Sequence, residues 1–590
     1  MKITNLKYLF AALPVIAFTA CMDFDSPGDE FDEAQEKIDP VIYSGDADLL
    51  DYTVQPTQEQ TQAALELLND YYDQFYTAQL YLLGGKDGGM PEAHQYQYTN
   101  SLTTDNFAGY TTCTQNWGGK MSSTYTYNRD FWEGPYGRFL SIKGLVGNLL
   151  NRDESNTIVE LKALALLIFD YAAADMVDLY GAIPYVDHKA NKESNPFTFN
   201  RGVDIYYSII KNLDDIVAVL DHYPERPQWY KDLVEPVMAY NDAISMNKQF
   251  ETWRRFANSL KLRMAMHISK YDPAQAKTWA EEAVASGVIE SKDDQMVICK
   301  VTENWNWHPL YNITVSWHDI CANASFVSIV TQLQHPYINY LLTPNSEDLV
   351  NETTGKVLPK ESAIIGLRAG LQMYNGQQYA VNPRVAFSAF ATEDCMYMPV
   401  YAMKWAEVDF HRAEGALRGW DMGGTAQFFY ERGIRNGDCS DVFVEYSGNY
   451  ERYLDDYMNV TEAVPYHYED PIDNNDIDGT LTIGVKWDDG DSQETKLEKI
   501  MTQKWLAIFP NSYEAWTDIR RTGYPKIFPV LNPQLGDGSL SYGDIIRRMP
   551  LPWGDIQAGL EDIQNSGLEA LGGENLMATR VFWDVPGSNF

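Results

Sequence analysis

The sequence predicts a mainly α protein of stacked helix hairpins, with long irregular aromatic-rich loops and minor β structure. Three observations lead to this fold class. Apolar residues recur at three- and four-residue steps in many segments, which is typical of amphipathic helices. These segments come in pairs that Gly or Pro residues separate. The stretches between the pairs, roughly 288–400 and 437–495, show no such periodicity.

The periodic segments predict eight helices before the C-terminal region. They cover residues 57–83, 131–150, 157–179, 203–220, 250–269, 273–286, 405–420 and 425–435. Alanines at the expected crossing points favour a tetratricopeptide-like stack, in which each hairpin buries its apolar face against the next. The 34-residue period of that repeat is not regular, so we expect a degenerate version. Aperiodic stretches of this length are typical of functional loops or of loops that carry small strands.

A helix hairpin is also predicted near the C-terminus. Pro510 ends a first helix, whose apolar face is formed by Leu497, Ile500, Met501, Trp505 and Ile508. Asn511 is in position to cap a second helix, with Glu514 three residues later as in a capping box. Gly523 and Pro525 are expected to end that second helix.

The N-terminus has the pattern of a secretory signal peptide. Lys2 and Lys7 precede an apolar run over residues 8–20, which is too short to span a bilayer. The residues Phe18 to Cys21 resemble a lipobox, so we expect Cys21 to be lipidated; an ordinary signal peptide followed by a free cysteine is the alternative. The predicted organisation is a signal peptide at 1–20, an acidic flexible tether at 21–50 and a single domain at 51–590.

Composition narrows the class of partner. The chain has 590 residues and a net charge of −38, which argues against a nucleic-acid partner because phosphate binding needs basic patches. The six cysteines form no CxxC pair. If Cys21 is lipidated, an odd number remains, so they cannot all form disulfides with one another.

Two aromatic loops are the predicted ligand site. Sugar rings stack on Trp or Tyr through their C–H faces, and their hydroxyls need polar partners. A Trp beside Asn in a Gly-containing loop favours a sugar-binding surface. The alternative is that the same residues pack the loop onto the scaffold. The candidate contacts are Tyr110, Asn116 and Trp117 in the first loop, and Trp305, Asn306, Trp307 and Trp317 in the second.

Enzymatic and metal chemistry have weaker support in the sequence. The chain has no G-x-S-x-G, HExxH, P-loop or Rossmann motif, so we expect a protein that is not an enzyme. With 83 acidic residues, carboxylate pairs for glycoside hydrolysis cannot be recognised by spacing. We expect no cofactor. Asp476 and Asp478 lie in a segment that fits the start of an EF-hand loop, but Val485 stands at position 12, so a structural Ca²⁺ competes with a solvated acidic loop.

Several C-terminal motifs resemble the SusD/RagB family. These are Lys504-Trp505, Glu514-Ala515-Trp516, Arg520-Arg521-Thr522-Gly523, Arg547-Arg548-Met549-Pro550 and the segment from Thr579 to Asp584. We expect these motifs to be structural, with Arg520, Arg521 and Arg547 paired with buried carboxylates such as Glu414.

The resemblance implies a nutrient-binding, lipid-anchored outer-membrane protein at the cell surface of a Bacteroidetes bacterium. It would capture an oligosaccharide and deliver it to a SusC-like TonB-dependent transporter. A peptide ligand is the alternative within the family. A surface glycoside hydrolase, or a structural partner that only seals the transporter, is an alternative of another class.

Overall fold

The computed structural model describes most of the chain after residue 91. The described residues are 92–116, 121–127, 134–151, 158–238, 249–299, 307–336, 338–373, 382–437, 450–552 and 557–590, with scattered positions between 57 and 78. The predicted signal peptide, tether and Cys21 lie outside them. None of the described helices is long and apolar enough to cross a membrane.

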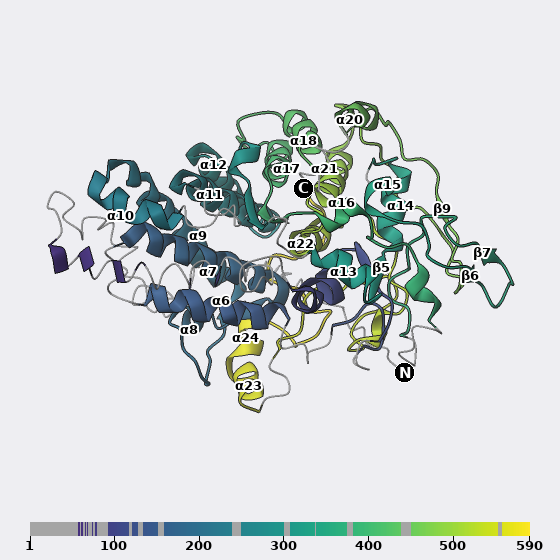
Figure 1. The fold of residues 1–590 in the computed structure, drawn as a ribbon, viewed down its shortest axis with the longest axis horizontal. Helices are drawn as coiled ribbons and strands as arrows, with labels where there is room; N and C mark the ends of the chain where they lie inside the picture. The colour runs from purple at the N-terminus through teal and green to yellow at the C-terminus, as the bar shows by residue number, and fades with distance from the viewer. Residues whose placement is uncertain are drawn as a thin grey trace, which may run out of the picture.

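Long helices packed side by side form the body of the molecule, which confirms the predicted fold class (Figure 1). They are α6 (Pro135–Leu150), α7 (Val159–Tyr180), α9 (Gly202–Asp221), α11 (Phe250–His267), α12 (Pro273–Ser286), α17 (Trp405–Leu417), α18 (Ala426–Arg435), α21 (Gln493–Ala507) and α22 (Ser512–Thr522). α7 packs between α6 and α9, α11 packs on both α9 and α12, and α17 joins α11 to α18 and α21. The stack is therefore continuous from the N-terminal to the C-terminal hairpins.

Shorter helices fill the rest of the described chain. They are α4 (Ala93–Tyr96), the π-helix η2 (Gln97–Thr104), α5 (Asp105–Phe107), α8 (Tyr185–Lys189), η5 (Tyr223–Glu225), α10 (Gln228–Met238), η6 (Lys292–Asp294), α13 (Pro309–Val315), α14 (Ala324–Gln332), α15 (Ile338–Leu341), η8 (Pro383–Ala386), α16 (Glu393–Met396), α20 (Tyr450–Met458), η9 (Pro533–Leu535), α23 (Gln557–Asp562), η10 (Ile563–Gly567) and α24 (Leu568–Leu571). Several of these short helices lie within residues 288–400 and 437–495. Parts of the stretches that were predicted to be loops are therefore helical.

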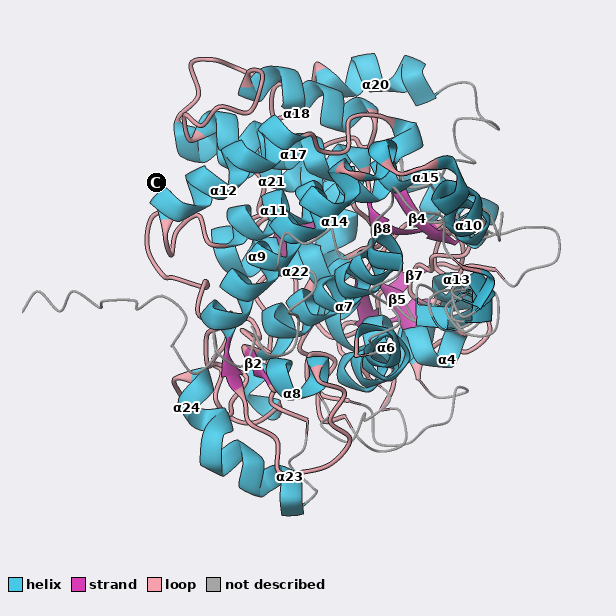
Figure 2. Ribbon diagram, turned by 90° about the vertical axis from the view of Figure 1, so that its left-hand side faces the viewer, coloured by secondary structure: helices cyan, strands magenta, loops and turns pink. Residues whose placement is uncertain are grey.

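The strands form small two-stranded antiparallel sheets among the helices (Figure 2). The pairs are β1 (Thr111–Cys113) with β5 (Ile320–Ala322), β2 (Ala182–Ile183) with β3 (Asn200–Arg201), β4 (Met296–Cys299) with β8 (Val400–Met403), β6 (Leu349–Val350) with β7 (Val357–Leu358), and β9 (His467–Tyr468) with β10 (Ile477–Asp478). In the first sheet Thr112 stands opposite Cys321. This pairing joins parts of the chain that are far apart in sequence.

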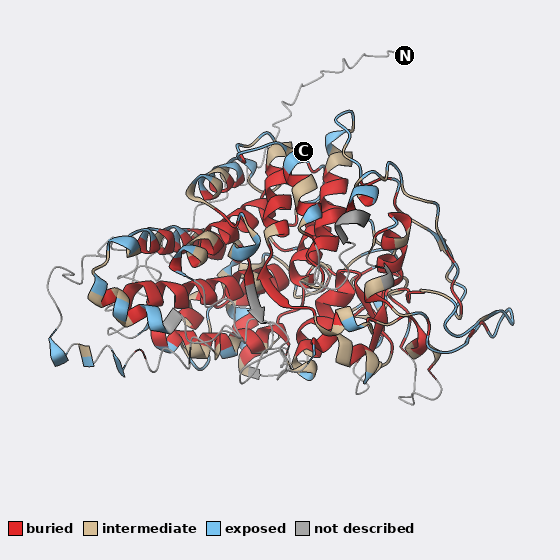
Figure 3. Cartoon of the chain, turned by 45° about the horizontal axis from the view of Figure 1, so that its top comes forward, coloured by how far each residue is buried: buried red, intermediate tan, exposed pale blue. Residues whose placement is uncertain are grey.

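The core runs through the middle of the helix stack (Figure 3). Almost every residue of α7 is buried, because helices or loops cover it on all sides. Most large aromatic side chains serve this core: Trp253, Trp505, Trp516 and Trp583 are all fully buried. Gly181 ends α7 with a φ of 85°, a conformation that L side chains rarely adopt.

The C-terminal hairpin follows the prediction except at its cap. α21 and α22 meet at Pro510, and Gly523 ends α22 in the left-handed conformation. Asn511 stands at the N-cap position, but its side chain makes no capping hydrogen bond. Glu514 points instead to Lys504 of α21, whose Nζ is 2.5 Å from Glu514 Oε1. The predicted capping box is therefore replaced by a buried ion pair.

Candidate functional site

The pairing of β1 with β5 brings the two predicted aromatic loops together. Thr114, directly after β1, donates its backbone N–H to the carbonyl of Asp319, at 2.9 Å. Gln115 donates from its side-chain amide to the Asp319 carboxylate, which Gln97 of η2 also contacts. The described ends of the first loop therefore rest on the residues that follow α13.

Among the described residues of this region, Trp307 is the exposed aromatic. It stands just before α13, with a relative exposure of 47%. Its ring lies edge-on to Tyr311, with 5.3 Å between centroids and an interplanar angle of 82°. The backbone N–H of His308 donates to the carbonyl of Met396, at 2.9 Å, and this bond fixes the start of α13 against α16.

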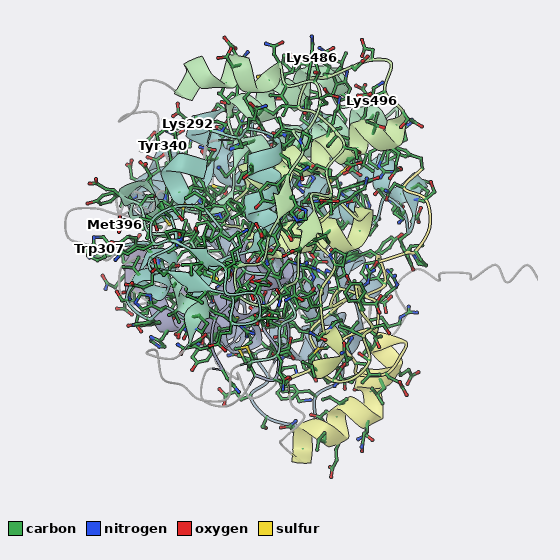
Figure 4. The ribbon with its side chains drawn as sticks, turned by 90° about the vertical axis from the view of Figure 1, so that its right-hand side faces the viewer. Lys292, Trp307, Tyr340, Met396, Lys486 and Lys496 are labelled. Carbon is green, nitrogen blue, oxygen red and sulfur yellow. The ribbon has the colours of Figure 1, made fainter. Side chains whose placement is uncertain are left out.

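One face of the molecule carries these residues together. Figure 4 shows Trp307 beside Met396 at the edge of the molecule, with Tyr340 of α15 above them. Tyr340 and Met396 are half-buried, and α16 packs between α13 and α15. We call Trp307, Tyr311, Tyr340 and Met396 the aromatic surface. Tyr340 and Met396 come from segments with no recognisable pattern, so sequence reasoning missed them.

Burial controls the charge beneath the aromatic surface. Burial lowers the pKa of His308 to about 3, so its ring is neutral, and its Nδ1 accepts the backbone N–H of Leu310 at 3.2 Å. Burial also raises the pKa of Asp319, although its bonds from Gln115 and Gln97 oppose that shift. The His308 ring beneath the surface is thus a neutral polar group, which suits a ligand rich in hydroxyl groups.

Two further candidates lie close to the core. Trp317 is half-buried and packs against the main hydrophobic core, so only part of its ring can reach a ligand. Asn116 is also half-buried, and its side-chain carbonyl accepts the backbone N–H of Met121 at 2.8 Å. Asn116 therefore has a structural role in the loop.

The prediction that Tyr110 contacts the ligand is wrong. Its side chain is fully buried, and its hydroxyl donates to the carbonyl of Trp505 at 2.6 Å. Its ring packs on Trp505 and Phe509, with centroids 4.8 Å and 5.0 Å away. Tyr110 is a core residue, since no part of it is accessible to a ligand. The predicted contacts Trp117, Trp305 and Asn306 lie outside the described residues.

The acidic segment does not gather its carboxylates into a metal-binding group. Asp478 pairs with His467 across the β9–β10 sheet, with 2.7 Å between Oδ1 and Nδ1. Asp476 accepts the backbone N–H of Asp470 at 2.8 Å. Neither belongs to a group of three His, Cys, Asp or Glu side chains with converging ligand atoms in the part of the chain that the structure describes. The geometry therefore gives the predicted calcium ligands structural partners within the protein.

Glu407, His411 and Glu514 form the one such group among the described residues, and they are buried. Cations already face both carboxylates. Arg263 Nη2 lies 2.6 Å from Glu407 Oε1, and Lys504 Nζ lies 2.5 Å from Glu514 Oε1. A divalent cation would add positive charge beside these two groups, so we interpret the cluster as a structural ion network rather than a metal site.

Comparison with known proteins identifies the family. The family model of SusD-like proteins, described as SusD and RagB outer-membrane lipoproteins, matches residues 52–584. The chain belongs to the SusD/RagB family. No curated protein matches this SusD-like chain.

Solved structures of SusD homologues have the same fold. A chitin-binding SusD homologue from Flavobacterium johnsoniae aligns with 28% identity and a TM-score of 0.72, over 88% of this chain and 100% of its own. A homologue from Bacteroides vulgatus aligns with 25% identity and a TM-score of 0.72, over 88% and 99%. One from Bacteroides thetaiotaomicron aligns with 26% identity and a TM-score of 0.69, also over 88% and 99%.

The arginines of the SusD-like motifs serve the scaffold. Arg521 donates to both oxygens of Glu414, at 2.6 Å and 2.7 Å, as predicted. Arg547 lies 3.4 Å from Asp584. Arg520 departs from the prediction, because it donates to the backbone carbonyls of Asp178 and Arg547 and stacks on Trp516. These motifs therefore identify the family through its scaffold and not through a ligand site.

Proposed function

We propose that this SusD-like protein is a cell-surface lipoprotein that captures an oligosaccharide and delivers it to a SusC-like TonB-dependent transporter. The observation that carries the proposal is the exposed ring of Trp307, held edge-on to Tyr311 at the start of α13. A ring that is exposed in this way is available to stack on a ligand. The chitin-binding homologue from Flavobacterium johnsoniae supports a glycan as the ligand.

The aromatic surface suits a sugar chain for two physical reasons. A sugar ring presents a flat C–H face that stacks on an exposed indole, and Tyr311 offers a second ring at right angles to it. A shallow surface of this kind leaves much of the ligand hydrated, so we expect modest affinity.

The N-terminus supplies the attachment in this proposal. Lipidation of Cys21 anchors the chain to the outer membrane, and residues 21–50 act as a flexible tether to one SusD-like domain over 51–590. A tether of this length lets the domain swing between capture of ligand and contact with the transporter. The protein then acts on its ligand by binding alone, and the transporter uses energy for import.

Affinity electrophoresis tests the proposal. Soluble protein starting at Met22 is run through native gels that contain neutral polysaccharides, chitin oligosaccharides being added as competitors. We expect one neutral glycan to retard the wild type and Trp307→Ala to remove most of that retardation, because loss of an aromatic stacking contact costs about 0.5–1.5 kcal/mol beyond the area that it buries. Phe428→Ala is the matched control, since Phe428 is 51% exposed on α18 and lies outside the aromatic surface.

Each alternative predicts a different outcome. Retardation that survives Trp307→Ala, with a cooperative unfolding transition, would place the ligand elsewhere. Binding of peptides but of no glycan would favour the peptide-binding alternative. Release of shorter sugars from the polysaccharide would indicate a glycoside hydrolase. Absence of any ligand, together with complex formation with the transporter, would favour a purely structural partner.

A further inference from the structure

A cavity of about 430 Å³ lies between α6, α8 and α23, away from the aromatic surface. Figure 2 shows α8 and α23 at the lower edge of the molecule, whereas α13 lies to the right. Residues of α6, of the segment after α8 and of α23 line it. The lining residues that carry the argument are Lys143, Gly144, Asn148, Asn191, Glu193 and Phe197.

Lys143 places a positive charge on the cavity wall. The residue is only 7% exposed, and its Nζ donates to the backbone carbonyl of Lys192 at 2.6 Å. No carboxylate of the described chain lies within 4.0 Å of this nitrogen; Glu193 acts on it only from farther away. An ammonium group has three donors, so two remain for a ligand. A buried cation without a close anion is costly, and a ligand carboxylate would relieve that cost.

Lys143 and Lys192 bring two positive charges to this part of an otherwise acidic protein, and Glu193 and Asp187 bring two negative ones. Burial, together with the positive charges of Lys143 and Lys192, lowers the pKa of His188 to about 3. Lys192 lies 3.2 Å from Asp187, so that lysine is compensated. Lys143 is therefore the cation that an anionic group entering the cavity would meet.

A helix end holds the wall in place. α8 closes in a Schellman motif: Lys192 donates its backbone N–H to the carbonyl of Asp187, and Asn191 donates to that of His188, both at 2.9 Å. Asn191 has the left-handed φ of 55° that this motif requires. The motif directs the Lys192 carbonyl at Lys143, and it packs the Asn191 side chain over Gly147, where a Cβ would meet it at 3.0 Å.

Polar and apolar groups complete the lining. The Asn191 amide donates to the side-chain carbonyl of Asn148 at 3.1 Å, which orients both amides at the cavity. Phe197 adds an aromatic ring, and its backbone N–H is held by Asp562 at 3.0 Å. A cation, two oriented amides and an aromatic ring form a set that matches a hydroxylated ring bearing a carboxylate.

We propose that this cavity is a second ligand site, which binds an acidic sugar residue with its carboxylate against Lys143 and its hydroxyls against Asn148 and Asn191. The site is independent of the aromatic surface, and it extends the range of ligands beyond the neutral glycan of the proposed function. Its test uses different residues and a different ligand, so either idea can fail without the other.

Gly144 provides a means of closing the cavity. A Cβ added there meets nothing within 4 Å, and the residue lines the cavity from within helix α6. Glycine inside a helix costs about 0.5–1 kcal/mol relative to alanine, so a larger residue need not weaken the fold. Gly144→Phe is expected to fill the cavity while the protein keeps its unfolding temperature.

Isothermal titration of the soluble protein with galacturonate, galactose and propionate tests the proposal. We expect galacturonate to bind at least about tenfold more tightly than galactose, a difference of about 1.4 kcal/mol, and propionate to bind more weakly than galacturonate. Lys143→Met should remove the preference for galacturonate and Gly144→Phe should abolish binding. Lys211→Met, which alters an exposed lysine on α9, should change neither the binding of galacturonate nor its preference over galactose.

Four results would overturn the proposal. They are equal affinity for galacturonate and galactose, no binding of galacturonate, propionate binding as tightly as galacturonate, and unchanged binding in a Lys143→Met protein that unfolds cooperatively. Glu193→Gln tests whether a negative charge on the lining weakens galacturonate binding. Removal of the acid nearest to Lys143 on the lining should strengthen galacturonate binding, and weaker binding would contradict the proposed role of charge.

Discussion

Arg521 and Glu414 show how single residues hold this scaffold. Both side chains are fully buried, and two hydrogen bonds join them. Burial raises the pKa of Glu414, but the charges of Arg521 and Arg418 outweigh it and hold that pKa well below its ordinary value. The Glu414 carboxylate is therefore ionised in the core, and the two arginines stabilise its negative charge.

Replacement of Arg521 by Met is expected to destabilise the protein by about 3–5 kcal/mol, because it leaves Glu414 and Asp518 buried with less compensation. Denaturant unfolding measures the change. Arg435→Met is the matched control, since Arg435 and its partner Asp455 are both exposed and such pairs contribute at most about 1 kcal/mol. Similar losses of unfolding free energy in the two variants would show that the buried ion pair contributes no more to stability than the exposed one.

Which aromatic residues are exposed could not be read from the sequence. Tyr110 and Trp307 both lie in aperiodic, polar segments, and both were reasonable candidates for ligand contact. Tyr110 is buried because Trp505 and Phe509, nearly 400 positions later, pack on its ring. No local pattern carries that information, whereas the exposure of Trp307 follows from its place at the start of a short surface helix.

At the scale of the element, the need for glycine at a helix end also depends on how its neighbours pack, as Gly181 shows. It ends α7 with φ 85°, and an added Cβ would lie 2.7 Å from Leu571 of α24. Gly523 ends α22 with nearly the same φ, 83°, but nothing lies within 4 Å of its Cβ position. The two glycines therefore share the backbone requirement, and only Gly181 has a crowded neighbour.

Alanine at either position tests this difference. Gly523→Ala is expected to cost about 1–2 kcal/mol, the penalty of the left-handed region for an L residue. Gly181→Ala should cost more, since Leu571 or α24 has to shift as well. Thermal and denaturant unfolding of both variants measure the costs. Equal losses would mean that α24 moves freely and does not press on the end of α7.

Helices were predictable where their apolar faces repeat. The expected segment 273–286 matches α12 at both ends, and 250–269 differs from α11 by two residues. α13, α14 and α20 went unpredicted because they are short or lie inside polar, aperiodic stretches. The strands are two to four residues long, and distant backbone partners define them rather than any alternation in the sequence.

At the scale of the whole molecule, a buried network of charges links α7, α11, α21 and α22. His267 of α11 connects α7 to α22, with Nδ1 3.2 Å from Asp178 and Nε2 3.0 Å from Glu514. Lys504 of α21 and Arg263 of α11 face the same Glu514. Burial lowers the pKa of His267, but the carboxylates of Glu514 and Asp178 outweigh it and raise that pKa to about 9.

This shift predicts how stability depends on pH. A histidine whose pKa rises from about 6.5 in the unfolded chain to about 9 stabilises the fold fully below pH 6.5, and this contribution is lost as pH rises to 9. Its size is on the order of 3 kcal/mol. Urea unfolding from pH 6 to 9.5 should show a decline that His267→Gln makes shallower. His222→Gln, at an exposed site, should leave the slope unchanged, and a wild-type slope in His267→Gln would contradict the assignment.

The pairing of β1 with β5 means that the proposed ligand site is completed late in folding. Thr112 and Cys321, which stand opposite each other, are 209 positions apart, and the sheet they form supports both aromatic loops. Closing so large a loop is slow compared with forming a helix hairpin, so the helices on either side can be native before the two loops meet. Under the proposed function, a glycan-binding assay would then report completion of the whole domain, and we expect fragments that contain only one of the two loops not to bind, however well they fold.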